Sequence, residues 1–221
     1  MKPEVFWTDQ FSPDNPLPVS TVLPAEVDVA IVGSGYTGLT AARVLAKAGS
    51  SVAVMDQYEI GWGASSRNGG MATPGLKQDI FKIHKKYGMD YAREFWRSSV
   101  DAIDLLEQII IEENIDCDWS RKGHIALACK QSHYDELPEY AAWIKKEMGH
   151  EKTIVPQEEI RSEIGTDTYF GGLSDESSGG LQPAKYVNGL ARAVADLGVK
   201  LCEDTRVEKI NRNGSGHELI T

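Results

Sequence analysis

The chain has little cysteine, no surplus of basic residues and no long apolar run. Its three cysteines lie far apart without a Cys-x-x-Cys pair, which argues against a disulfide framework or a zinc site. The 23 lysines and arginines face 33 aspartates and glutamates, a net charge of -10, so nothing is available to neutralise a nucleic-acid backbone. No apolar window reaches the roughly 18 residues of a membrane span, and no secretion signal begins the chain. We therefore expect a cytoplasmic protein with no metal, no nucleic-acid partner and no membrane span.

Proline is concentrated at the start of the chain. Of the nine prolines, five lie in residues 1–26, where hydrophobic periodicity is weak. Because proline fixes its backbone angle and lacks an N–H group, this composition predicts an extended arm on the surface.

A short apolar strand and a glycine-rich turn follow the arm. Residues 27–32, VDVAIV, have the nearly continuous apolar pattern of a parallel strand covered on both faces. The pattern G-x-G-x-x-G comes next, and a helix is expected over 36–48. A second strand of the same type, SVAVMD, ends on Asp56. A strand, a glycine turn, a helix and an acidic strand end in this order are typical of a dinucleotide site.

Each glycine of the turn has a physical role in such a site. Gly33 permits the tight turn, Gly35 lets the backbone approach a pyrophosphate, and Gly38 lets the helix pack on the strand. The helix start at Tyr36 and Thr37 adds N–H groups and a partial positive charge that favour phosphates. The turn therefore predicts where a pyrophosphate binds.

Asp56 and the order of the later elements bear on which dinucleotide is bound. A carboxylate at Asp56 can accept the hydroxyl hydrogens of an adenosine ribose and would repel a 2′-phosphate, which disfavours NADP. An NAD enzyme of the doubly wound kind would place its third parallel strand soon after the second. Here the third strand, VKLCED at 199–204, returns only after a long insertion and precedes a hairpin. This order favours FAD, while an NAD-dependent dehydrogenase and a non-catalytic nucleotide-binding remnant remain as alternatives.

The segment GWGASSRNGG, residues 61–70, predicts a second set of cofactor contacts. Its glycines let the backbone lie against a flat ring system, and its small residues 64–66 are expected to begin another helix with N–H groups facing anions. Arg67 supplies a permanent cation, and Asn68 supplies a donor and an acceptor for ring edges. The residues expected to contact the cofactor here are Gly63, Ala64, Ser65, Ser66, Arg67, Asn68 and Gly69.

The remaining patterns predict an α/β fold. We expect a Rossmann-like FAD/NAD(P)-binding domain, with a parallel sheet and a β-meander, interrupted by an α+β substrate domain. Helices are predicted over 79–87, 90–114, 134–148 and 183–197, a helical turn over 156–164, strands over 124–129 and 169–175, and a hairpin around Asn213-Gly214. The expected division is an arm at 1–26, the FAD-binding domain at 27–76 and 176–221, and the inserted domain at 77–175. Because the sequence stops inside the last strand, we expect a fragment of a longer protein.

Three blocks of this sequence, residues 28–56, 61–70 and 179–207, resemble the FAD-dependent oxidoreductases of the D-amino-acid oxidase (DAO) type. Within that family the chain is most similar to the γ-glutamylputrescine oxidoreductase branch. The resemblance implies that Gly33, Gly35 and Gly38 hold the FAD pyrophosphate, that Asp56 binds the ribose, and that the backbone of Val207 contacts the adenine. Asp56 departs from the glutamate more usual there. Family members continue for roughly as many residues again.

The activity that the resemblance implies is oxidation of a C–N bond in a small-molecule amine or amino acid. The substrate would be γ-glutamylputrescine-like or D-amino-acid-like, and oxygen or another acceptor would reoxidise the flavin. Arg67 would stabilise the electron-rich reduced ring. The catalytic base stays unknown, because the five histidines show no paired spacing.

Overall fold

The computed structural model describes residues 4–11, 13 and 15–221, and the chain forms two compact units. Unit 1 consists of Met1–Gly70, Ile109–Asp118 and Gln182–Thr221, and unit 2 of Met71–Gln108 and Trp119–Leu181. These breaks lie a few residues from the predicted boundaries, and one stretch inside the predicted insertion returns to unit 1.

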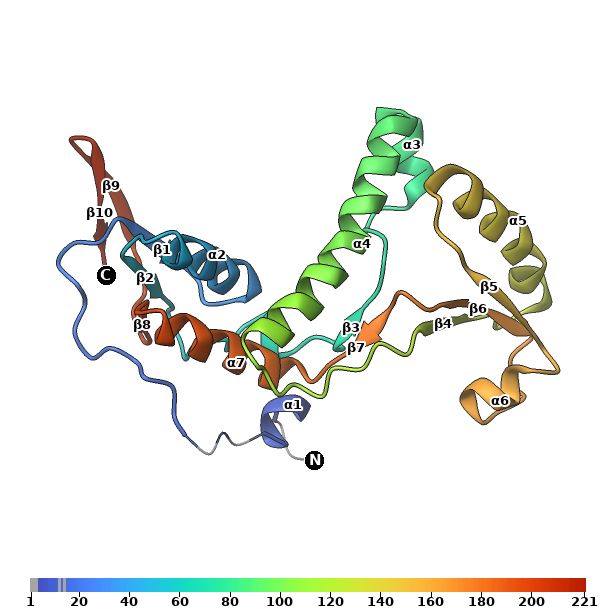
Figure 1. Ribbon diagram of the computed structural model, residues 1–221, viewed down its shortest axis with the longest axis horizontal. Coiled ribbons are helices and arrows are strands. Elements are labelled where there is room, and N and C mark those ends of the chain that lie inside the picture. The colour runs from blue at the N-terminus through green and yellow to red at the C-terminus, as the bar shows by residue number, and fades with distance from the viewer. Residues whose placement is uncertain (1–3, 12, 14) are drawn as a thin grey trace. The chain divides into compact units, whose positions relative to one another are not determined.

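A parallel three-stranded sheet forms the centre of unit 1 (Figure 1). Its order is β1 (Val29–Val32), β2 (Val52–Met55) and β8 (Lys200–Cys202). Val54 of the middle strand lies opposite Ile31 on one side and Leu201 on the other. All four residues of β2 are buried, as the apolar run predicts. The predicted α/β fold with a parallel sheet is confirmed.

The strand β1 is less covered than its sequence indicates. The apolar run predicts burial on both faces, but its residues alternate between half-buried and exposed, and Val32 is 56% exposed. Among the described strands β1 pairs only with β2, so it is an edge strand of this sheet. The prediction of full burial was wrong for β1. An apolar sequence shows that a strand is able to be buried, whereas the position of the strand in the sheet decides how much of it other elements cover.

Two helices of unit 1 pack against one another beside this sheet (Figure 1). They are α2 (Tyr36–Lys47) and α7 (Pro183–Asp196), which confirm the predicted helices. Pro183 occupies the first turn, and the Gln182 side chain caps α7 by accepting a hydrogen bond from the Lys185 N–H at 2.8 Å. The fully buried side chains of these two helices include Leu39, Ala42, Leu190, Ala191 and Val194.

The end of α4 (Met89–Glu112) and the residues after it belong to unit 1. Ile115 packs so closely on Gly189 of α7 that an added Cβ at that glycine would lie 2.3 Å from Ile115 Cγ2. The buried guanidinium of Arg43 on α2 pairs with Glu113 at 2.6 Å. These contacts explain why the stretch leaves unit 2, and helical periodicity alone cannot show them.

The N-terminal arm and the C-terminal hairpin complete unit 1. The arm contains a short helix, α1 (Phe6–Asp9), where the sequence predicted only extended chain, and Val19 forms a parallel bridge with Leu201. Residues 1–3, 12 and 14 of the predicted arm lie outside the described residues. The hairpin of β9 (Lys209–Asn213) and β10 (Gly216–Ile220) confirms the prediction.

Unit 2 combines an antiparallel sheet with helices. The sheet order is β4 (His124–Leu127), β6 (Gly171–Asp175), β5 (Thr153–Pro156), and a two-stranded ribbon pairs β3 (Met71–Ala72) with β7 (Gly179–Gly180). The helices besides α4 are α3 (Ile80–Tyr87), α5 (Gln131–Met148) and α6 (Ile160–Ile164). The core cluster of α3, α4 and α5 consists of Ile80, Ile83, Ala92, Trp96 and Ile144. The strands β3, β5 and β7 were not predicted; β3 and β7 have two residues each, too few to show periodicity. None of the helices in the described part of the chain has the length and apolar character needed to cross a bilayer.

Candidate cofactor site

The turn between β1 and α2 packs as closely as its glycines predict. Gly33 has φ 102°, in the region that side chains rarely adopt. A Cβ added to Gly38 would lie 2.0 Å from the Gly33 carbonyl oxygen, and one added to Gly35 would lie 2.9 Å from the Ser65 hydroxyl oxygen. The geometry of the turn itself therefore requires glycine at Gly33 and Gly38. Gly35 is required for a different reason, because its backbone lies close to Ser65 of segment 61–70.

Asp56 is joined to this turn through Ser34. Asp56 Oδ2 accepts hydrogen bonds from the Ser34 N–H at 2.8 Å and from the Ser34 hydroxyl at 2.5 Å. The same hydroxyl accepts the Gly61 N–H at 2.9 Å. Ser34 is fully buried and so links the turn, the predicted ribose-binding carboxylate and the start of segment 61–70. Ser34 was not among the predicted site residues, because the position between the first two glycines carries no residue preference in the motif.

Segment 61–70 forms a compact turn instead of the predicted helix. Its only helical residues are η1 (Ala64–Ser66), a single 3₁₀ turn. The Asn68 side chain closes the segment on itself, since its amide group donates to the carbonyl oxygens of Ala64 at 3.2 Å and Ser65 at 3.1 Å. Asn68 Oδ1 accepts the Gly70 N–H at 2.8 Å. The expected helix was wrong because these side-chain bonds compete with a helical ladder, and one short turn provides no helix dipole.

Ser65 brings the two predicted binding segments together. Its hydroxyl accepts the Tyr36 N–H at 3.0 Å, at the start of α2 where the pyrophosphate is predicted. The Tyr36 ring packs on Tyr186 of α7 with 5.1 Å between ring centroids, and burial raises the pKa of the Tyr36 phenol. The Tyr36 side chain is thus neutral and packed, and it lies beside the predicted phosphate position.

Arg67 is held by Trp62 and is exposed. Its Nε donates to the Trp62 carbonyl oxygen at 2.6 Å, and its guanidinium lies 4.0 Å from the centroid of the Trp62 ring. Its two terminal nitrogens make no hydrogen bond to any residue described by the structure. The predicted role of Arg67 beside a reduced flavin stays a prediction.

The chain that follows β8 also lies next to Asp56. The Thr205 N–H donates to the Asp56 carbonyl oxygen at 2.7 Å, and Val207, half-buried, follows two residues later. The structure therefore gathers predicted residues from four separate segments of unit 1. Thr37, Gly63, Ala64 and Gly69 are exposed, and Ser66 is buried.

Residues 28–221 match the family of FAD-dependent oxidoreductases denoted DAO. The chain belongs to this family. It is 36% identical over 189 residues to the probable oxidoreductase OrdL of Haemophilus influenzae, covering 85% of this chain and 44% of that protein. It is 34% identical over 183 residues to the γ-glutamylputrescine oxidoreductase of Escherichia coli, covering 83% and 43%.

Solved structures show the same fold. Glycine oxidase from Geobacillus kaustophilus superimposes with a TM-score of 0.70 at 26% identity, covering 87% of this chain and 50% of that one. The chain spans about half the length of these curated relatives.

The DAO-family chain has the features that FAD binding requires. Gly35 lacks a Cβ where the twelve-residue helix α2 begins, and the start of such a helix carries the N–H groups and partial positive charge that favour a pyrophosphate. Asp56 Oδ2 already accepts two hydrogen bonds from Ser34, and Oδ1 accepts the Tyr58 N–H at 3.1 Å, so one acceptor site on Oδ1 is left for a ribose hydroxyl. The residues present therefore fit FAD.

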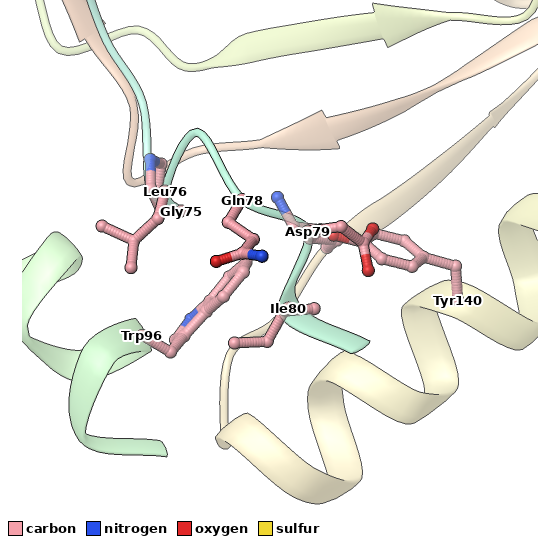
Figure 2. A pocket seen from close by; sticks show the side chains of 9 residues that line it. Gly75, Leu76, Gln78, Asp79, Ile80, Trp96 and Tyr140 are labelled. Atoms are coloured by element: carbon pink, nitrogen blue, oxygen red, sulfur yellow. The ribbon is translucent and has the colours of Figure 1, made fainter. Parts of the chain in front are cut away.

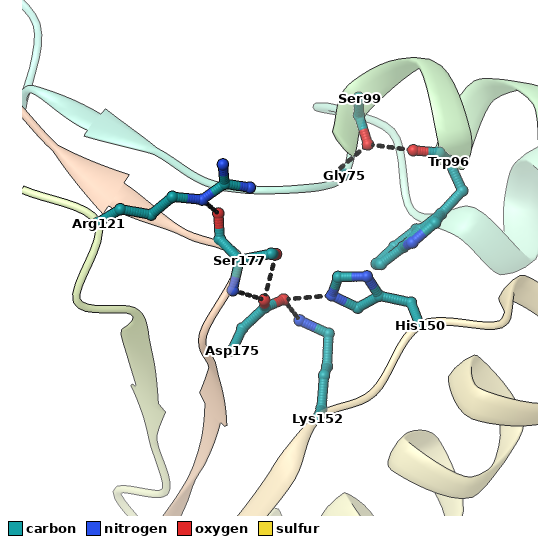
Figure 3. A network of polar contacts seen from close by, with 8 residues as sticks. All are labelled: Gly75, Trp96, Ser99, Arg121, His150, Lys152, Asp175 and Ser177. Atoms are coloured by element: carbon teal, nitrogen blue, oxygen red, sulfur yellow. Dashed lines mark hydrogen bonds and ion pairs between the residues drawn. The ribbon is translucent and has the colours of Figure 1, made fainter. Parts of the chain in front are cut away.

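A buried polar network lies in unit 2 of the DAO-family chain (Figure 3). Asp175, whose side chain is 4% exposed, accepts hydrogen bonds from His150 Nε2 at 2.9 Å, from the Lys152 ammonium, and from the Ser177 hydroxyl at 2.6 Å. Burial by itself would raise the pKa of Asp175, but these hydrogen bonds from His150, Lys152 and Ser177 lower it far below its ordinary value. Asp175 is consequently a carboxylate in the folded protein.

A pocket of about 200 Å³ lies next to this network (Figure 2). Trp96, Tyr140 and Lys152 are among its lining residues, together with the chain before α3. The buried Trp96 Nε1 has no hydrogen-bond partner among the residues that the structure describes. None of the predicted cofactor residues lines this pocket.

Proposed function

We propose that the chain is the dinucleotide-binding part, with its inserted unit, of an oxidoreductase that oxidises a C–N bond of an amine or amino acid. The observation that carries the proposal is the joining of the glycine turn, Asp56 and segment 61–70 through Ser34 and Ser65, in a chain that belongs to the DAO family. The similarity to the γ-glutamylputrescine oxidoreductase supports a substrate of that chemical kind, and a D-amino-acid-like substrate is the second candidate.

A few residues of the chain would each bind a different part of FAD. When bound, FAD accepts the hydride from the carbon beside the amine nitrogen and passes the electrons to oxygen or another acceptor. The start of α2 would hold the pyrophosphate, Asp56 the ribose hydroxyls, and the Val207 backbone the adenine. Arg67 would place a fixed positive charge near the ring. Three free cysteines support a place in the reducing cytoplasm.

A matched pair of glycine substitutions tests cofactor binding. We expect Gly35→Ala to weaken FAD binding at least tenfold, because its methyl group meets Ser65 Oγ and occupies the approach of the phosphate. Gly216→Ala is the control, since that glycine lies in β10 and an added Cβ would come no closer than 3.8 Å to Asn213 O. FAD released from the denatured chain and the quenching of FAD fluorescence measure the binding. Equal binding by both variants contradicts the site, and bound NAD with no flavin would instead support a nicotinamide-dependent dehydrogenase.

The substrate class is tested by anaerobic reduction of the bound flavin. γ-Glutamylputrescine, glycine and D-alanine are added separately, and the absorption band of oxidised flavin is followed. We expect γ-glutamylputrescine to bleach it fastest. Retention of FAD without bleaching by any amine would argue against C–N oxidation by this chain.

A further inference from the structure

The N-terminal arm makes a direct hydrogen bond to the predicted flavin-side segment. Trp7 Nε1 donates to the Asn68 carbonyl oxygen at 2.7 Å, across 61 positions of sequence. The Trp7 carbonyl oxygen in turn accepts Gln182 Nε2 at 2.9 Å. One arm residue therefore connects segment 61–70 with the start of α7.

The Asn68 carbonyl oxygen is held from outside segment 61–70. The Asn68 side chain bonds to Ala64, Ser65 and the Gly70 N–H, but none of these bonds involves the Asn68 carbonyl, which precedes the consecutive glycines Gly69 and Gly70. Glycine loses more conformational freedom on ordering than any other residue. Gly70 also has φ 71°, so the chain turns sharply there. Among the described residues, the hydrogen bond from Trp7 is the contact that fixes this carbonyl.

The arm is attached at other points as well. Arg192 donates to the Asn15 carbonyl oxygen at 2.7 Å, and the Ser20 N–H donates to the Leu201 carbonyl oxygen at 2.7 Å. Loss of the indole N–H would thus leave the arm in place. The role of Trp7 can be separated from the role of the arm as a whole.

We propose that Trp7 is a positioning residue that orders segment 61–70 before the flavin binds. A segment that is ordered in advance does not lose that freedom on binding, so FAD binds more tightly. The inference rests on the proposed function for its cofactor. It assigns to the arm a part in cofactor binding.

Two variants and one control test the proposal in the full chain. Trp7→Phe keeps an aromatic ring and removes the N–H donor. Gln182→Glu keeps the acceptor for the Lys185 N–H and removes the donor to the Trp7 carbonyl. Trp143→Phe in α5 of unit 2 makes the same chemical change far along the chain from both segments. Amide hydrogen exchange of residues 61–70 is measured without FAD, and the dissociation constant of FAD is measured separately.

We expect Trp7→Phe and Gln182→Glu to speed exchange in 61–70 about fivefold and to weaken FAD binding about fivefold, which corresponds to about 1 kcal/mol. Trp143→Phe should change neither quantity. Unchanged FAD affinity in Trp7→Phe overturns the proposal, even if exchange is faster. A wild-type chain that binds no FAD overturns the proposed function. In that case faster exchange in Trp7→Phe still supports Trp7 as the residue that orders segment 61–70. Unchanged exchange in Trp7→Phe overturns that role.

Discussion

Replacement of Asp175 by asparagine tests the buried network of unit 2. The substitution keeps the shape of the side chain and removes its charge, so the Lys152 ammonium, 11% exposed, loses its carboxylate partner. Removal of one partner from a buried ion pair costs about 3–5 kcal/mol, because the other charge stays buried without compensation. We expect the free energy of unfolding to fall by this amount near neutral pH.

The effect depends on pH in a direction that the lowered pKa of Asp175 determines. The unfolded chain takes up the proton near the ordinary value of 3.8, whereas the folded chain takes it up only at a lower pH. The network therefore stabilises the protein fully above 3.8, and this contribution is lost as the pH falls from 3.8 towards the folded-state pKa. The difference between wild type and Asp175→Asn should shrink over that acid range.

Urea unfolding followed by tryptophan fluorescence measures the effect. Trp96 lies edge-on to His150 with 5.4 Å between ring centroids, so its emission reports on the network. Asp104→Asn is the control, because Asp104 is 56% exposed and pairs with Arg121; we expect it to cost at most about 1 kcal/mol. An Asp175→Asn variant no less stable than this control would refute the reasoning. In the double variant Lys152→Met/Asp175→Asn, the loss should be smaller than the sum of the single losses, since no unpaired charge is left.

Two further pairs of variants test the packing of unit 1. Gly61→Ala should destabilise the protein by about 1–3 kcal/mol, because Gly61 has φ 75° and an added Cβ would lie 2.8 Å from Val187 Cγ2. The control Gly63→Ala has open space at its Cβ, so its free energy of unfolding in the same urea measurement should stay within about 0.5 kcal/mol of the wild-type value. Equal losses would show that the segment adjusts. Arg43→Met should cost about 2–3 kcal/mol, since Lys47 is then the one ion-pair partner of Glu113 among the residues that the structure describes. The exposed pair Arg97 and Glu94 provides the control Arg97→Met, with a loss of at most about 1 kcal/mol, and a similar loss in both variants would contradict the importance of the buried pair.

Much of unit 1 could be predicted because its signals are local. The apolar strands, the helix periodicity and Pro183 at the first turn of α7 each depend on residues a few positions apart, and the structure confirms them. Gly33 and Gly38 were predictable for the same reason, since backbone geometry inside one turn requires them.

Other features were not predictable from local patterns. The helix expected at 64–66 is one 3₁₀ turn, because the Asn68 side chain takes the backbone carbonyls, and a propensity count does not weigh that competition. The edge position of β1 depends on which strands come to pair with it.

The sequence by itself determined the elements, the nucleotide-binding turn and the family resemblance, because these depend on residue type and short spacing. Only the tertiary structure decided that Ser34 and Ser65 join three segments and that Trp7 reaches Asn68. It also decided that Asp175 pairs with two basic side chains, His150 and Lys152, from the chain just before β5. Each of these is a contact between residues far apart in sequence, and the folded backbone, not local preference, sets the distance between them.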